Sequence, residues 1–71
     1  MTLAFAALVR PPGRPESRSV FRSREAALRC AKRAVERDGG TADVVWLKDG
    51  VPKLWLALVS EGGISLTEHW V

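Results

Sequence analysis

The strongest constraint on the fold lies between residues 41 and 60, where an Asp-Gly dipeptide at positions 49–50 separates two apolar runs. Asp-Gly tolerates positive φ at both central positions and forms a two-residue turn whose twist matches that of antiparallel strands. The sequence therefore predicts a β-hairpin with strands over residues 42–48 and 51–60. A second tight turn is expected at Gly62-Gly63, followed by a third strand over residues 64–71.

Residues 23–38, upstream of the hairpin, have the pattern of one amphipathic helix. Ser23 is a suitable N-cap, and the helix is expected to run to about Arg37 and to end at Asp38-Gly39-Gly40, because a glycine there can adopt the left-handed conformation. Apolar residues recur three and four positions apart, at Ala27, Leu28, Ala31, Ala34 and Val35. Since this stripe consists mainly of alanine, we expect the helix to lie close to the surface that it covers.

The first part of the chain predicts two more strands separated by a loop. Residues 2–10 favour a strand, and residues 19–22 a short second strand that pairs with it. Residues 11–18 contain three prolines, which fix φ and lack a backbone donor, so a Pro/Arg-rich loop is expected there. The prediction is one small domain over residues 1–71 of the α+β class, in the order β(β)αβββ. In it, a single helix packs on one face of a mostly antiparallel sheet of four to five strands.

Pairing across the two predicted turns assigns the side chains to two faces of the sheet, because directly opposed residues share a face and neighbours alternate. One face is expected to bring all three tryptophans against the helix. A shift of one residue in the register at Gly62-Gly63 would reverse part of this assignment. Its members are Val44, Trp46, Trp55, Ala57, Val59, Ile64, Leu66 and Trp70. The other face collects Val45, Leu47, Leu54, Leu56 and Leu58.

This second apolar face is the predicted interface with a protein partner or with a second copy of the chain. A chain of 71 residues is near the lower limit for a self-sufficient core and commonly needs a disulfide, a metal or association. Cys30 and His69 are the only cysteine and the only histidine, which excludes an intrachain disulfide and leaves zinc without its usual ligands. We therefore expect no metal or cofactor. We expect the second apolar face to be buried in a homodimer or in a complex with a protein partner. The alternative is that the N-terminal segment or the Pro/Arg loop covers this face.

Charge is distributed unevenly along the chain. Residues 1–37 hold nine basic and three acidic side chains, whereas residues 38–71 hold two basic and five acidic ones. A basic surface of this kind can contact the phosphates of nucleic acid or the carboxylates of an acidic protein. The alternative is a solvated helix face that Glu25–Arg29 and Lys32–Glu36 pairs support. The nine candidates are Arg10, Arg14, Arg18, Arg22, Arg24, Arg29, Lys32, Arg33 and Arg37.

Enzymatic activity is not expected, and no catalytic residue or small-molecule substrate is assigned. Cys30 and His69 lie on different predicted elements, and Glu68 and His69 would point to opposite faces of a strand. The apolar run Leu3–Val9 follows no positive residue and is too short to span a bilayer, so a strand is expected there rather than a signal peptide or a membrane segment. A single free cysteine is compatible with a reducing cytoplasm.

The segment FRSREAALRCAKRAVERDGGTADVVWLKDG, residues 21–50, resembles a pattern found in very small uncharacterised bacterial and phage domains. In that pattern an alanine-rich helix leads to a strand, an Asp-Gly turn and another strand, and it implies no catalytic residues. Small size and an apolar sheet face are also similar to phage-encoded inhibitors, including anti-CRISPR proteins. The resemblance implies a non-catalytic module that binds a larger macromolecular machine; a small basic nucleic-acid-binding protein is the alternative.

Overall fold

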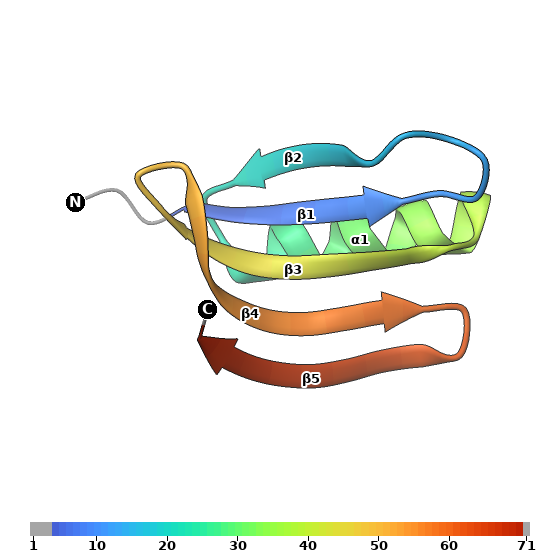
Figure 1. Ribbon diagram of the computed structural model, residues 1–71. Coiled ribbons are helices and arrows are strands. Elements are labelled where there is room, and N and C mark those ends of the chain that lie inside the picture. The colour runs from blue at the N-terminus through green and yellow to red at the C-terminus, as the bar shows by residue number, and fades with distance from the viewer. Residues whose placement is uncertain (1–3, 71) are drawn as a thin grey trace.

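The computed structural model describes residues 4–70, which form one helix and one five-stranded antiparallel sheet in the order β2-β1-β3-β4-β5 (Figure 1). The helix α1 (Arg24–Asp38) lies between β2 and β3 in the chain. The α+β class is therefore confirmed. Residues 2, 3 and 71 of the predicted strands lie outside the described residues. The strands are β1 (Ala4–Arg10), β2 (Ser17–Phe21), β3 (Thr41–Lys48), β4 (Val51–Ser60) and β5 (Gly63–Trp70).

Local signals determine where α1 begins and ends. Ser23 has extended backbone angles, and its hydroxyl accepts a hydrogen bond of 3.1 Å from the backbone N–H of Ala26, as an N-cap does. At the other end Gly39 has a φ of 76° and donates its N–H to the carbonyl of Val35 at 2.8 Å. The predicted N-cap is confirmed. The helix ends at the predicted glycine, but Gly39 combines its positive φ with a ψ of −167°, outside the left-handed helical conformation that was expected.

One predicted turn is confirmed and the other is displaced. Asp49 and Gly50 have φ values of 53° and 79°, as a two-residue hairpin turn with positive φ at both positions requires. The next turn uses Glu61-Gly62, because Ser60 pairs directly with Gly63. The predicted loop at Gly62-Gly63 is therefore wrong. β2 also begins at Ser17, so the last two residues of the predicted 11–18 loop belong to a strand.

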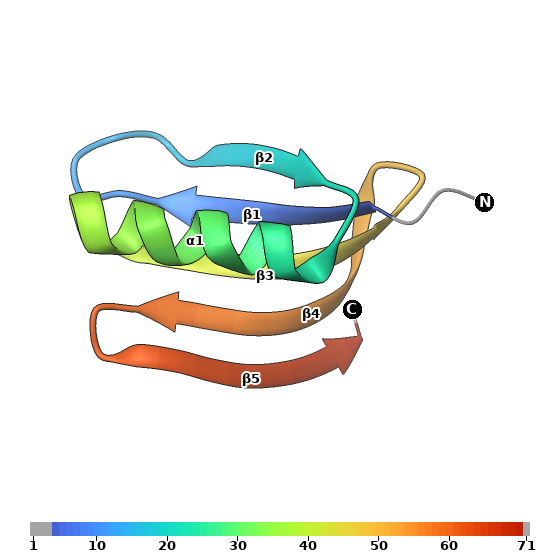
Figure 2. The ribbon, with the colours of Figure 1, turned by 180° about the vertical axis from the view of Figure 1, so that it is seen from behind.

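The helix packs on one face of the sheet, mainly across β1 and β3 (Figure 2). Its buried residues are Ala27, Ala31, Ala34 and Val35, and the small side chains let the helix lie close to the strands. They meet buried side chains of three strands: Ala7, Val9, Ala42, Val44, Leu56, Ala57 and Val59. β5 contributes no residue to this core, because the helix lies over the other strands.

Two irregularities in β4 decide which of its side chains face the helix. The register with β3 shifts between Val44 and Val45 and again between Trp46 and Leu47, which leaves Leu56 and Lys53 as the extra residues of β4. A bulge bends its strand and breaks the alternation of side chains. Leu54 and Leu56 consequently lie with the core under the helix.

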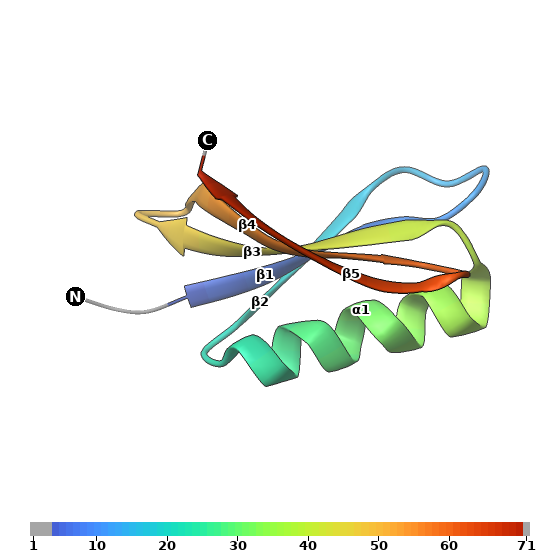
Figure 3. The same ribbon diagram turned by 90° about the horizontal axis from the view of Figure 1, so that it is seen from below.

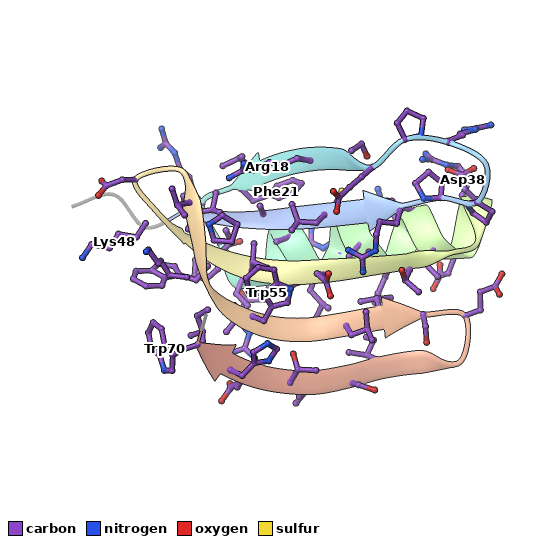
Figure 4. The ribbon with its side chains drawn as sticks, viewed as in Figure 1. Arg18, Phe21, Asp38, Lys48, Trp55 and Trp70 are labelled. Atoms are coloured by element: carbon purple, nitrogen blue, oxygen red, sulfur yellow. The ribbon has the colours of Figure 1, made fainter. Side chains whose placement is uncertain are left out.

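The same irregularities place Trp55 on the opposite face, beside Val45 and Leu47. The predicted meeting of all three tryptophans under the helix is therefore wrong. Only Trp46 is packed against the core beneath α1. In Figure 4, Trp55 lies in front of the sheet while the helix lies behind it.

The face opposite the helix is covered in part by the curvature of the sheet. Ala6 and Val45 are fully buried there and Leu47 is 3% exposed, with Trp55 packed against them. Figure 3 shows the strong twist that carries the β3–β4 hairpin away from the helix. Arg18 of β2 ties this hairpin down by donating a hydrogen bond of 2.6 Å to the carbonyl of Gly50. Cover for this face thus comes from the chain's own second hairpin.

Candidate interaction surface

The most exposed apolar side chains of the described residues lie largely on β5. Ile64 is 42% exposed, Leu66 72% and Trp70 67%. They were predicted to lie inside, and that prediction is wrong. A helix is about 10 Å wide and adjacent strands are about 4.8 Å apart, so one helix covers about two strands of a sheet. β5 lies at the edge of the sheet, beyond this cover.

Even-numbered residues of β5 face the side of the sheet that carries the helix. Ile64 lies opposite Val59 and Leu66 opposite Ala57, both of which are core residues. Trp70 makes an edge-to-face contact with Trp46, with ring centroids 5.9 Å apart and an interplanar angle of 88°. We call Ile64, Leu66 and Trp70 the β5 stripe.

The remaining side chains of β5 are polar. Glu68 lies on the same face as the β5 stripe and forms an exposed ion pair of 3.5 Å with Arg24 at the start of α1. His69 lies on the other face and stacks on Trp55, with ring centroids 6.1 Å apart. Ser65 lies opposite Leu58 on that same face. β5 therefore presents a mainly apolar face on the helix side, interrupted by Glu68, and a polar face on the other.

An open groove of about 310 Å³ continues from the β5 stripe toward the helix. Ile64 belongs both to the stripe and to the lining of this groove. Val35 and Val59 supply an apolar floor, whereas Lys32 and Glu36 of α1 and Glu61 of the turn supply charged groups at the rim. The stripe and the groove together form one concave, partly apolar surface beside α1.

The two edges of the sheet differ in how they are protected. Proteins discourage pairing at a sheet edge with short strands, charges or proline. β2 has five residues, follows Pro15 and carries Arg18, whose side chain is tied to the β3–β4 hairpin. β5 has eight residues, of which Glu68 is the only Asp, Glu, Lys or Arg, and every one of these residues is exposed. The pairing of β5 with β4 is irregular at Thr67 and Glu68, where β5 has one residue more than β4. β5 is thus the longer and less charged of the two edges, and we call it the open edge.

The five residues predicted as a partner or dimer interface do not form one exposed surface. Val45 and Leu47 are buried on the face opposite the helix. Leu56 is buried and Leu54 partly buried on the helix side, and Leu58 is partly buried opposite Asp43. The prediction that all five share one face is wrong because the bulge at Leu56 moves β4 out of regular alternation.

Four of the nine predicted basic residues are engaged within the chain. Arg10 donates to Asp43 at 2.7 Å and to Glu16 at 3.4 Å; the bond to Asp43 is the main cause of a raised pKa of Arg10, which burial partly opposes. Arg18 bonds to the Gly50 carbonyl as described. The other two, Arg24 and Arg37, form the exposed ion pairs Arg24–Glu68 and Arg37–Asp38.

The other five basic side chains form no ion pair within residues 4–70, and the expected Glu25–Arg29 and Lys32–Glu36 pairs are not formed. Arg33 is exposed on α1, and Lys32 is exposed at the rim of the groove. The predicted basic residues that are exposed and form no ion pair within residues 4–70 are Arg14, Arg22, Arg29, Lys32 and Arg33.

Cys30 and His69 are far from forming a reactive pair. Cys30 is partly buried on α1 and packs beside the core on the helix side. His69 lies on the opposite face of the sheet, against Trp55. Within the described part of the chain, no three His, Cys, Asp or Glu residues are grouped so that they could hold a metal ion. Nor is any helix there both long and apolar enough to cross a bilayer.

Comparisons of the chain with protein-family models, with curated proteins and with solved structures find no match. The candidate surface is therefore defined by its own geometry. Sequence reasoning missed it because the alternation of Ile64, Leu66 and Trp70 with polar residues has the same pattern as a strand with one buried face. The number of strands relative to a single 15-residue helix was the available signal that one strand would remain uncovered.

Proposed function

We propose that the protein is a non-catalytic interaction module that binds a protein partner through the β5 stripe. One observation carries the proposal: three large apolar side chains are 42–72% exposed on the open edge strand of the sheet. Apolar groups beside an unpaired strand can gain both burial and backbone hydrogen bonds from a partner. A module of this kind acts by occupying a surface of its partner, as an inhibitor or an adaptor does.

The test compares three immobilised forms of the protein as baits: the wild type, Leu66→Asp and Val20→Asp. Leu66 and Val20 are both exposed, at 72% and 59%, but they lie on opposite edges of the sheet. We expect the wild type and Val20→Asp to retain the same protein from an extract of the source cells, and Leu66→Asp to lose at least nine-tenths of it, as about 1.4 kcal/mol of lost binding free energy would cause.

Mass spectrometry of the retained protein identifies the partner, whether it is a different protein or the chain itself. Circular dichroism of the three baits serves as the control for folding. Equal retention by all three baits would contradict the proposal, because the β5 stripe would then contribute nothing to binding.

A second candidate function, binding of nucleic acid, rests on five of the predicted basic residues, namely Arg14, Arg22, Arg29, Lys32 and Arg33, which are exposed and form no ion pair within residues 4–70. Arg29 and Arg33 are one helical turn apart on the outer part of α1. Contacts with phosphates release counterions, so such binding weakens steeply with added salt. Lys32 also lines the groove that contains Ile64, so this basic surface adjoins the β5 stripe.

Arg29→Glu combined with Arg33→Glu tests this candidate. We expect the affinity for a fluorescent duplex at low salt to be at least tenfold lower in the double variant. In the wild type, the logarithm of the binding constant should fall with the logarithm of the salt concentration, with a slope of about −0.9 per phosphate contact. Fluorescence anisotropy measures both quantities. Absence of binding by the wild type at low salt would exclude nucleic-acid binding. This outcome would leave the proposal for the β5 stripe unchanged.

A further inference from the structure

A second open cavity, of about 400 Å³, lies on the side of α1 away from the β5 stripe. It is bounded by α1, β2 and the loop that joins β1 to β2, and Val9, Cys30 and Ala34 form its apolar floor. The twist of the sheet carries the start of β2 away from the helix at this place (Figure 3). We infer that this cavity, with Arg14 in its lining, binds a small organic acid that has one carboxylate and an apolar body.

β2 turns hydroxyl groups toward the cavity, on the face where a strand usually carries apolar side chains. Ser17 lies opposite Val9 and Ser19 lies opposite Ala7, and both partners belong to the core beneath α1. Opposed residues share a face, so the two serines face the helix side, where they line the cavity. Within residues 4–70 neither hydroxyl takes part in a side-chain hydrogen bond. Both hydroxyls are therefore available to donate to an acceptor that enters the cavity.

A tight turn in the loop determines where Arg14 lies. Gly13 has a φ of 71°, and the ring of Pro12 fixes a negative φ at the position before it. Together with the hydrogen bond of 3.4 Å from the backbone N–H of Arg14 to the carbonyl of Pro11, this combination is that of a type II turn. Arg14 follows the turn at the edge of the cavity, is exposed and forms no ion pair within residues 4–70. Its guanidinium is thus free to pair with an anion.

The charges around the cavity favour a ligand with a single negative charge. The charged residues of the lining are Arg14, Arg37 and Asp38, two positive and one negative. Arg37 pairs with Asp38 at 3.1 Å, which leaves Arg14 as the unpaired cation. One carboxylate neutralises this cation, whereas a phosphate monoester would bring close to two negative charges. The groove beside the β5 stripe has the opposite balance, with one positive and two negative residues in its lining.

The size and the lining of the cavity agree with a ligand of this kind. Small-molecule sites have volumes of about 300–1,000 Å³ and consist mainly of apolar groups, with a few polar groups that fix the orientation of the ligand. Here the apolar floor accommodates the hydrocarbon body, and Arg14 and the two serine hydroxyls bind the carboxylate. Because the cavity is open, a ligand of about ten non-hydrogen atoms should bind with a dissociation constant of about 1 mM.

Two-dimensional NMR of the ¹⁵N-labelled protein tests the inference, with octanoate as the probe. We expect octanoate to shift the amide signals of Ser17, Ser19 and Ala34 in a saturable manner and to leave those of Ile64 and Leu66 in place. Octylammonium has the same body and the opposite charge, so it should bind the cavity about tenfold more weakly or less. Equal binding of the two probes at the cavity would overturn the inference, and so would shifts confined to the β5 stripe.

Arg14→Gln and Arg22→Gln are a matched pair of variants. Both arginines are exposed and form no ion pair within residues 4–70, but Arg14 lines the cavity and Arg22 does not. We expect Arg14→Gln to weaken the binding of octanoate about tenfold, as the loss of a charge-assisted hydrogen bond causes, and Arg22→Gln to leave it unchanged. Equal affinities of the two variants would overturn the role of Arg14 and with it the proposed ligand.

Ser19→Leu supplies a second test, because it fills the cavity from β2. We expect this variant to lose the saturable shifts at Ala34 while its amide spectrum keeps the dispersion of a folded protein. Undiminished binding by Ser19→Leu would overturn the site, as would the absence of saturable shifts in the wild type at octanoate concentrations well above the expected dissociation constant. These outcomes concern the cavity alone and leave the proposed function of the β5 stripe intact.

Discussion

Gly40, between α1 and β3, is the residue that tolerates change least on geometric grounds. Its φ is 82°, and a Cβ at this position would meet the backbone carbonyl oxygen of Arg10 and lie 3.0 Å from the ring of Pro12. We expect Gly40→Ala to lower the free energy of unfolding by about 2–3 kcal/mol, because the penalty for a left-handed residue adds to a clash with backbone atoms. Urea unfolding followed by circular dichroism measures this loss.

Gly50 is the matched control for Gly40. It has a similar φ of 79°, but nothing lies within 4 Å of the position that a Cβ would occupy. Gly50→Ala should therefore cost only the conformational penalty, about 1 kcal/mol. Equal losses for the two variants would mean that the carbonyl of Arg10 moves aside and does not constrain the connection between α1 and β3.

The bulge of β4 has the largest consequence at the scale of elements, because it places Leu56 and Leu58 on opposite faces of the sheet. We expect Leu56→Ala, in the core under the helix, to lower the free energy of unfolding by about 2–4 kcal/mol. Leu58→Ala, at a partly buried position, should cost about 1 kcal/mol. Urea unfolding of both variants checks the difference, with Leu56→Val as a milder substitution. A greater loss for Leu58 would contradict the bulge.

The helix and the turn of the β3–β4 hairpin were predictable because their signals are local. Ser23, Gly39 and Asp49-Gly50 each determine the backbone of their own neighbourhood, whatever the rest of the chain does. The faces of β4 were not predictable, because Leu56 and Lys53 become extra residues only when β4 pairs with β3. The candidate surface on β5 was missed for a similar reason: its exposure depends on where α1 lies across the sheet.

At the scale of the whole molecule, the basic and acidic parts of the sequence are joined by ion pairs between them. Arg10 reaches Asp43, and Arg24 reaches Glu68. Asp43 is only 14% exposed, whereas Glu68 is 63% exposed. Some of the charged side chains behind the asymmetry thus pair with one another within the fold, and the others can interact with a partner.

Asp43→Ala should lower the free energy of unfolding by about 1–2 kcal/mol, because it leaves a partly buried guanidinium without its shortest partner. Glu68→Ala should cost less than about 0.5 kcal/mol, since its pair with Arg24 is exposed and screened by salt. Urea unfolding at low and high salt measures both changes. Equal losses would contradict the distinction between the two pairs.

The contribution of Arg10 to stability should depend little on pH above neutrality. A raised pKa of Arg10 means that the folded state favours its charged form, so this contribution is present below the ordinary arginine pKa and is lost only as the pH rises through the raised value. That value lies beyond the alkaline range in which proteins are usually studied. Urea unfolding of the wild type and of Asp43→Ala between neutral and moderately alkaline pH checks this. The difference in the free energy of unfolding between the two proteins should stay constant over this range.

The place of β1 in the sheet also has a consequence for the order of folding. β1 lies between β2, which follows it closely in the chain, and β3, where Thr41 is 31 positions after its partner Arg10. The β1–β2 hairpin needs only a short loop to close, whereas pairing of β1 with β3 must first overcome the entropy of closing a much longer one. Formation of α1 from local contacts shortens the path between them. We therefore expect docking of β3 beside β1 to limit the rate of folding, and the β4–β5 hairpin to join afterwards.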